Sequence, residues 1–241
     1  MRLLLSESGT PAPGTQVDEA TLRSLYATPD DRSWLRANFV SSLDGAVTGG
    51  DGRSGSINTP ADFTVFSLLR SLSDVVVVGA GTVRAEGYPA LRDEDPDAPV
   101  LAVVSNRGRL PSTVAAMTSP RGSALLVTCE AAASADVERA RAVLGDENVI
   151  VVGSDRVDLV AARKSLEDKG FRRILSEGGP SLFGAMLDAG VVDEVDLTWA
   201  PTLVGGGPGR ITAGPSVDLA LTPMVMLEED GTVLGRWRVD R

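Results

Sequence analysis

Short apolar runs alternate with helix-length patterns along most of the chain, and this alternation limits the fold more than any other feature. Val75–Val78 and Leu125–Val127 are apolar at consecutive positions, which is typical of strands covered on both faces. Between such runs, apolar residues recur three and four positions apart, as on one face of a helix. The alternation predicts an α/β fold whose central mixed sheet is mainly parallel and flanked by helices in three layers.

The expected strands are apolar runs bounded by turn residues. They are Arg36–Ser41, Asp74–Val78, Val100–Val104, Ala124–Thr128, Val149–Val152, Arg172–Ser176, Glu194–Ala200, Met224–Glu228 and Val233–Val239. The last two flank Glu229-Asp230-Gly231, which predicts an antiparallel C-terminal hairpin. The expected helices cover 18–26, 59–73, 134–144, 158–169 and 180–189. Thr59-Pro60 is typical of a helix start, and glycines 145, 170 and 190 follow helix ends, where a left-handed residue is favoured.

The sequence predicts one domain preceded by an N-terminal extension. Residues 1–33 are rich in Ser, Thr, Pro and Gly, and we expect them to form an N-terminal extension packed on the body. Residues 34–241 contain no internal repeat and no linker that would divide them. They are therefore expected to form a single domain.

Two absences limit the chemistry that this chain can perform. It has no histidine, so Ser-His-Asp triads and His-ligated metals are excluded. Its single cysteine, Cys129, permits neither an intrachain disulfide nor a Cys-rich zinc site, and no metal site is expected. The net charge of −10 argues against binding to nucleic acid. Without a secretory signal or a run of apolar residues long enough to span a membrane, we expect a cytoplasmic protein that contacts no membrane.

Glycine-rich turns follow three of the expected strands. The turns 79–82 and 176–181 each lie between a strand and a helix start, where backbone N–H groups can bind phosphate. If both lie at the carboxyl ends of parallel strands, they form one crevice for a nucleotide pyrophosphate. A plain tight turn is the alternative for each. The third segment, 205–209, fits either a close backbone approach or a mobile flap.

These motifs, taken together and in order, resemble a known family. The matching segments are Asn38–Gly45, Ile57–Thr59, Leu69-Arg70 with Asp74, Val78–Val83, Ser176–Pro180, Val192–Glu194 and Ala200–Gly206. They are similar to the reductase domain of riboflavin biosynthesis, which is the C-terminal half of the bifunctional deaminase/reductase and also a stand-alone pyrimidine reductase. The zinc site of the deaminase half could not be built in this chain.

The resemblance implies a dihydrofolate-reductase-like fold, a homodimer, and a small-molecule substrate. It also implies NADPH-dependent reduction of a 5-amino-6-ribosylaminouracil phosphate to its ribitylamino form. The implied cofactor-binding residues are Val40, Ser56, Gly79, Ala80, Gly81, Thr82, Glu86, Ser105, Gly178, Gly179, Pro180, Ser181, Leu182 and Phe183. The implied substrate-binding residues are Asn38, Ser54, Asn58, Arg70, Leu91, Arg92 and Glu177.

Several of these side chains have two interpretations. Asp44 is the candidate for protonating or stabilising the reacting group, or else an Asx-turn residue. Arg70 could grip the sugar phosphate with its planar fork, or balance a helix C-terminus. Arg107 and Arg109 could hold the 2′-phosphate of NADPH, or be exposed loop charges.

The chain departs from the family pattern on the expected substrate side. Asn38 stands where relatives often carry lysine, and Ala85–Pro89 replaces an Asp-Asp-Pro segment with one extra residue. Two alternatives to the pyrimidine reductase therefore remain. One keeps the fold and NADPH but reduces a dihydropterin, and the other is a non-catalytic module that only binds the nucleotide.

Overall fold

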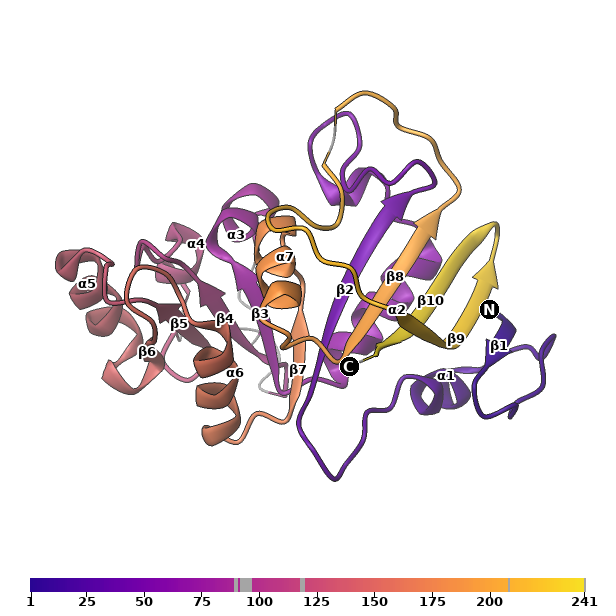
Figure 1. The fold of residues 1–241 in the computed structure, drawn as a ribbon, viewed down its shortest axis with the longest axis horizontal. Coiled ribbons are helices and arrows are strands. Elements are labelled where there is room, and N and C mark those ends of the chain that lie inside the picture. Colours follow the sequence, from indigo (N-terminus) through magenta and orange to yellow (C-terminus); the bar gives the residue numbers. More distant parts are fainter. Residues whose placement is uncertain (89–90, 92–96, 118–119, 208, 241) are drawn as a thin grey trace.

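A single twisted sheet runs through the whole of the computed structural model, which describes residues 1–88, 91, 97–117, 120–207 and 209–240. The strands lie in the order β1-β9-β10-β8-β2-β7-β3-β4-β5-β6, and Figure 1 shows them from β6 on the left to β1 on the right. From β8 to β6 all neighbouring strands are parallel, whereas β10, β9 and β1 pair antiparallel. The expected α/β fold with a mainly parallel sheet and an antiparallel end is confirmed.

All nine expected strands are found, to within a few residues at each end, and one further strand, β1, precedes them. They are β1 Arg2–Ser6, β2 Trp34–Ser42, β3 Val75–Gly79, β4 Val100–Val104, β5 Ala124–Thr128, β6 Val149–Val151, β7 Arg173–Ser176, β8 Glu194–Ala200, β9 Leu221–Glu229 and β10 Thr232–Val239. Only Asp230 and Gly231 separate β9 from β10, and both have positive φ, at 50° and 80°. That conformation matches the right-handed twist of a hairpin, as the turn sequence predicts.

The helices cover both faces of the sheet. They are α1 Glu19–Leu25, α2 Pro60–Ser71, α3 Ala80–Glu86, α4 Ser112–Ala115, α5 Ser134–Leu144, α6 Leu159–Asp168 and α7 Pro180–Asp188. One core joins α2, α3 and α5 to side chains such as Val76 and Val78, while α6 and α7 pack against Val75 and Val77 on the opposite face. The consecutive apolar residues of β3 are therefore explained by burial on both sides. None of the described helices is long and apolar enough to cross a membrane.

The first residues of the chain belong to the sheet rather than merely lying against it. Strand β1 was not expected from the sequence, and it extends the sheet by pairing antiparallel with β9. The amino group of Met1 bonds to Glu229 at 3.0 Å, beside the hairpin turn. Helix α1 begins at Asp18, whose carboxylate accepts a hydrogen bond from the N–H of Thr21. The extension thus contributes an edge strand, although the division of the chain at residue 33 stays a prediction.

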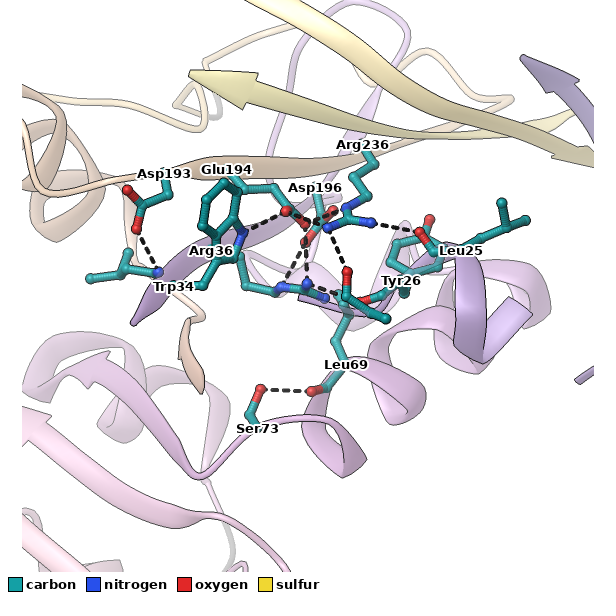
Figure 2. A network of polar contacts seen from close by, with 12 residues as sticks. Leu25, Tyr26, Trp34, Arg36, Leu69, Ser73, Asp193, Glu194, Asp196 and Arg236 are labelled. Carbon is teal, nitrogen blue, oxygen red and sulfur yellow. Dashed lines mark hydrogen bonds and ion pairs between the residues drawn. The ribbon is translucent and has the colours of Figure 1, made fainter. Parts of the chain in front are cut away.

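A buried group of charges, which we call the sealed ion cluster, fastens this extension to the sheet. It consists of Arg36 on β2, Glu194 and Asp196 on β8, and Arg236 on β10, all at most 7% exposed. Figure 2 shows these side chains converging. Arg236 Nε and Nη2 each donate to Glu194 at 2.8 Å, and its Nη1 and Nη2 also donate to the carbonyls of residues 25 and 27. Arg36 Nη2 donates to the carbonyl of Tyr26 at 2.9 Å.

The pKa values of the two acids in the sealed ion cluster are shifted in opposite directions. Burial raises the pKa of Asp196 well above its usual value, and the neighbouring Glu194 carboxylate raises it further. Burial also acts on Glu194, but Arg36 and Arg236 outweigh it and keep the pKa of Glu194 below its usual value. We therefore assign the negative charge of the cluster to Glu194, which both guanidinium groups contact.

Candidate active site

A cavity of about 470 Å³ lies where β2, β3 and β7 end. Phe39 and Val40 of β2 contribute to its floor, and residues 81–86 of α3, 62–70 of α2 and 177–180 surround it. These three strands are parallel neighbours, so their carboxyl ends meet at one edge of the sheet. Open α/β sheets bind their ligands at this edge.

The two glycine turns expected to converge do so beside this cavity. The N–H of Gly79 donates to the carbonyl of Gly178 at 2.7 Å, which joins the end of β3 to the turn after β7. The peptide bond between Gly178 and Gly179 is cis. Gly79 and Gly179 are the N-cap residues of α3 and α7, and neither has a side chain to cap the helix. Backbone N–H groups of two helix starts therefore remain available at one place.

The second turn packs so closely against Phe39 and Thr82 that its two glycines leave no room for side chains. A Cβ atom at Gly178 would lie 2.6 Å from Cζ of Phe39, and one at Gly179 would lie 2.6 Å from Oγ1 of Thr82. At Gly81 a Cβ atom would meet nothing within 4 Å, so the start of α3 is open. Bare backbone at uncapped helix starts is what nucleotide phosphates bind.

The most polar contact of the cavity is an arginine–glutamate pair between α2 and the second turn. Arg70 donates from Nε and Nη2 to the two carboxylate oxygens of Glu177, at 2.7 and 2.8 Å. The hydroxyl of Tyr88 donates to the same carboxylate at 2.5 Å. The Arg70 guanidinium also stacks over the ring of Phe66, 4.2 Å from its centre. We call Arg70, Glu177 and Tyr88 the open ion cluster, because all three line the cavity.

This pairing changes the interpretation of Arg70. Its guanidinium fork, in the last turn of α2, is already engaged by a carboxylate rather than held ready for a phosphate. Burial raises the pKa of Tyr88 well above its usual value, and the Glu177 carboxylate adds to this effect. The phenol is therefore the hydrogen-bond donor in the open ion cluster.

About half of the expected cofactor-binding residues line the cavity. Those in the lining are Val40, Gly81, Thr82, Glu86, Gly179 and Pro180. Beside them in the same two turns, and in the first turns of α3 and α7, lie Gly79, Ala80, Gly178, Ser181, Leu182 and Phe183. Phe183 is 1% exposed and packs against Phe39 with 4.8 Å between the ring centres. We therefore interpret Phe183 as a core residue that supports the turn.

Three expected cofactor-binding residues lie neither in the cavity lining nor in the two glycine turns and the helix starts beside it. The hydroxyl of Ser56 contacts Asp51 and the carbonyl of Arg53, so it closes its own loop. Ser105 follows β4, is buried, and exchanges backbone contacts with β5. Arg107 is exposed in the loop after β4. Its neighbour Arg109 pairs with Asp136 at 3.2 Å, in agreement with the alternative that these are loop charges.

Most of the expected substrate-binding residues line the cavity, and the others do not. Asn38, Ser54, Asn58, Arg70 and Glu177 line the cavity. The N–H of Ser54 donates to Glu86 at 3.1 Å, which ties the loop after β2 to α3. Leu91 packs against the core on the α2 side, and Arg92 lies outside the described residues.

Asp44, the expected catalytic residue, holds a turn rather than facing the cavity. Its carboxylate accepts hydrogen bonds from the Ser42 hydroxyl and from the N–H groups of Val204 and Gly205. These bonds, that of Ser42 first, lower the pKa of Asp44 to about 2. A carboxyl group with this pKa is ionised at neutral pH and cannot supply a proton. The geometry favours the turn interpretation, and it gives the catalytic assignment no support.

Other cavity residues were not expected from the sequence. Asp62 and Phe66 of α2, Tyr88, and residues 47, 48 and 52 belong to the lining. Gly209, from the third glycine-rich segment, also lines it, and its carbonyl accepts from the N–H of Val47 at 3.1 Å. Asp62 lies in the first turn of α2. Among the described residues, no group of three or more acidic, Cys or His side chains could hold a metal ion.

Comparisons with known proteins agree with this geometry. The model of the RibD C-terminal domain family matches residues 33–232. The 2,5-diamino-6-ribosylamino-4(3H)-pyrimidinone 5′-phosphate reductase of Methanothermobacter thermautotrophicus is 32% identical, over 78% of this chain and 87% of that protein. The reductase of the same name from Archaeoglobus fulgidus is 29% identical, over 73% and 83%.

The fold has a counterpart among solved structures. A pyrimidine reductase-like protein from Corynebacterium diphtheriae superposes with a TM-score of 0.77 and 24% identity, covering 91% of this chain and 98% of that one. This likeness concerns the fold, while the sequence match carries the family assignment. The family model spans the cavity, both glycine turns and the open ion cluster. The chain belongs to the RibD C-terminal domain family.

Proposed function

We propose that this protein is an NADPH-dependent reductase of riboflavin biosynthesis that acts on a phosphorylated ribosylaminopyrimidine. The reaction would convert the ribosylamino side chain of a 5-amino-6-ribosylaminouracil phosphate, or its diaminopyrimidinone counterpart, to the ribitylamino form. The names of the archaeal relatives and the family match support this substrate class. The observation that carries the proposal is the bond from Gly79 to Gly178, which joins two uncapped helix starts beside one cavity.

The chain's residues have separable tasks in this proposal. Backbone groups of residues 79–82 and 178–182 would hold the phosphates of NADPH, which when bound supplies a hydride. Phe39 and Val40 form an apolar floor that excludes water from the reacting atoms. The open ion cluster lines the same cavity and would orient the acceptor. Orientation and exclusion of water are the main demands of hydride transfer, so the chain needs no histidine.

The cavity also favours a second acceptor class. Three carboxyl groups, those of Asp62, Glu86 and Glu177, line it together with Arg70, whose fork is already engaged. An acidic lining suits a neutral heterocycle with ring N–H donors better than a phosphate. A dihydropterin is such a heterocycle, and it is the second candidate.

Steady-state rates of NADPH oxidation with each acceptor separate the candidates. We expect turnover of the phosphorylated pyrimidine. Turnover of a dihydropterin alone would show that the second candidate is the acceptor. Tight NADPH binding without turnover of either acceptor would show that the protein is a non-catalytic module. The homodimer implied by the family resemblance is part of the same proposal, and a monomer in light scattering would contradict it.

The cofactor assignment predicts a specific effect of Gly179→Ala. The added methyl group would lie 2.6 Å from Oγ1 of Thr82, so the Thr82 side chain must rotate or the two turns must move apart. Overpacking of this kind costs about 1–3 kcal/mol, and we expect the NADPH dissociation constant to rise by about 5-fold to 100-fold in calorimetric titration. Gly50→Ala is the matched control, because a Cβ atom there meets nothing within 4 Å. Equal affinities in both variants would contradict the assignment.

A further inference from the structure

Asp62 is a buried acid in the cavity to which neither the sequence nor the proposed function assigns a task. It lies in the first turn of α2, where its N–H donates to Oγ1 of the N-cap residue Thr59 at 3.2 Å. Asp residues at this position usually stabilise a helix from an exposed surface. This one is only 4% exposed and lines the cavity. A helix-capping role does not explain such burial, because a solvated carboxylate would stabilise the helix as well.

The surroundings of Asp62 keep cations away from it. Its side-chain partner is the hydroxyl of Thr198 on β8, which is itself 2% exposed. The cation of the cavity lining, Arg70, is just over two turns further along α2 and is held by Glu177. No ion pair with Asp62 is found in the part of the chain that the structure describes. A buried acid without a cation favours its neutral, proton-carrying form.

Other ionisable groups also lie near Asp62, and most of them are bonded to other residues. Arg70, Glu86, Glu177 and Tyr88 line the same cavity, and Asp196 with Arg236 lies on the strands beneath α2. Arg70 and Tyr88 bond to Glu177, while Glu86 accepts the N–H of Ser54. Arg236 bonds to Glu194. Burial raises the pKa of Asp62 above its usual value, and the Thr198 hydroxyl offsets only part of this effect.

We propose that Asp62 is the proton donor for the reduction, delivering its proton to the nitrogen of the C=N bond that the enzyme reduces. The inference rests on the proposed function and applies to either acceptor class. In the pyrimidine acceptor this C=N bond is that of the ring-opened, imine form of the ribosylamino group, and in a dihydropterin it is a bond of the heterocycle. In either case the C=N double bond becomes a CH–NH unit. Its carbon gains the hydride that the reduced nicotinamide supplies when bound, and its nitrogen gains the proton of the Asp62 carboxyl. The carboxylate that remains is protonated again by solvent before the next turnover.

The first test is the pH profile of the wild type and of Asp62→Asn, which keeps the shape of the side chain but carries no acidic proton. Protonated Asp62 is the active form, so the wild-type kcat should fall as pH rises through the raised pKa of Asp62. In Asp62→Asn we expect kcat to drop by about 100-fold to 10,000-fold at low pH, and the pH-dependent fall to disappear. NADPH affinity should change little. Asp168→Asn, an exposed carboxyl on α6, is the control and should keep the wild-type profile.

The second test follows the carboxyl group itself, without turnover. In the NADPH-free protein labelled with ¹³C at Asp carboxyl carbons, Asp62 should titrate above the usual range, and this signal should be missing in Asp62→Asn. Asp196→Asn identifies the other buried carboxyl with a raised pKa. Thr198→Val, which removes a bond that favours the charged form, should raise the pKa of Asp62 further and move the fall in kcat to higher pH. If Thr198 had only a structural role, its substitution would not change the pH at which kcat falls.

The possible failures are distinguishable. If Asp62→Asn keeps the wild-type kcat and pH profile, or if its carboxyl titrates at or below the usual range, the assignment of Asp62 is wrong while the reductase function stands. If the wild type reduces neither acceptor, the proposed function is wrong and the assignment falls with it.

Discussion

Two regions of this molecule pair arginine with a nearly inaccessible glutamate, and their surroundings differ. In the sealed ion cluster, the side chains of Arg36 and Glu194 are 2% and 0% exposed, and the arginines also bind carbonyls of residues 25–27. In the open ion cluster, the side chain of Glu177 is 3% exposed but that of Arg70 is 22% exposed, beside a cavity. The first set is closed off from solvent by the fold. The second leaves one side of the guanidinium facing space that a ligand can fill.

The comparison teaches that burial alone does not distinguish a structural ion pair from a functional one. Removing one partner of a fully enclosed pair leaves an uncompensated charge with no access to water. Removing one partner of a pair at a cavity leaves a charge that water can reach, so stability suffers less and ligand binding suffers more. The following predictions test this difference, beginning with the largest effect.

Arg236→Met should break the sealed ion cluster. The substitution removes both bonds to Glu194 and the donors to the carbonyls of Leu25 and Ala27. We expect the free energy of unfolding to fall by about 3–5 kcal/mol in urea denaturation. Lys164→Met, which removes an exposed ion pair with Asp168, should cost much less, because solvent screens exposed charges. Equal losses of unfolding free energy in the two variants would show that burial does not increase the contribution of an ion pair to stability.

Arg70→Lys should affect binding of the acceptor more than stability. A lysine cannot make the two-pronged contact with Glu177, and it loses the stacking on Phe66. A charge-assisted hydrogen bond contributes about 1.5–3 kcal/mol, so we expect the KM of the acceptor to rise by about 10-fold to 100-fold, with NADPH affinity unchanged. Arg141→Lys, in an exposed pair with Glu138, is the control. An unchanged KM would show that the ion pair of Arg70 has a structural role and does not contribute to acceptor binding.

Asp44→Asn should give the smallest effect, visible only in acid. The folded-state pKa of Asp44, about 2, lies below its usual value, so its bonds to Ser42, Val204 and Gly205 stabilise the protein above about pH 4. That contribution is lost as pH falls towards 2. The melting temperature of the wild type should therefore drop more steeply between pH 4 and 2 than that of the variant. Parallel curves would mean that these bonds do not persist in solution.

The sequence predicts the features that depend on local pattern. The apolar runs of β3 and β5 indicate a parallel sheet covered on both faces, and the cores on its two faces agree. Asp230 and Gly231 predict a tight hairpin because both tolerate positive φ. The convergence of the two glycine turns also follows, since carboxyl ends of parallel strands share one edge.

Features that depend on partners far along the chain are not predicted. Strand β1 is a short edge strand that forms by pairing with β9, over 200 residues away. The engagement of Arg70 by Glu177 joins residues 107 positions apart, so the spacing of neither residue indicates it. Asp62 sits in a helix-start pattern that fully accounts for it locally, and only the covering strands make it an inaccessible acid. Local patterns indicate where a site lies, whereas protonation and pairing depend on tertiary packing.

The bonds from the arginines to residues 25–27 have a practical consequence for anyone who shortens this chain. The family match runs from residue 33 to residue 232, yet the three acceptor carbonyls precede that span and Arg236 follows it. A fragment cut at those two positions would keep Glu194 and Arg36 but lose the groups that neutralise and cover them. Truncation to the span of the family match would thus destabilise the protein, although every residue that lines the cavity would be retained.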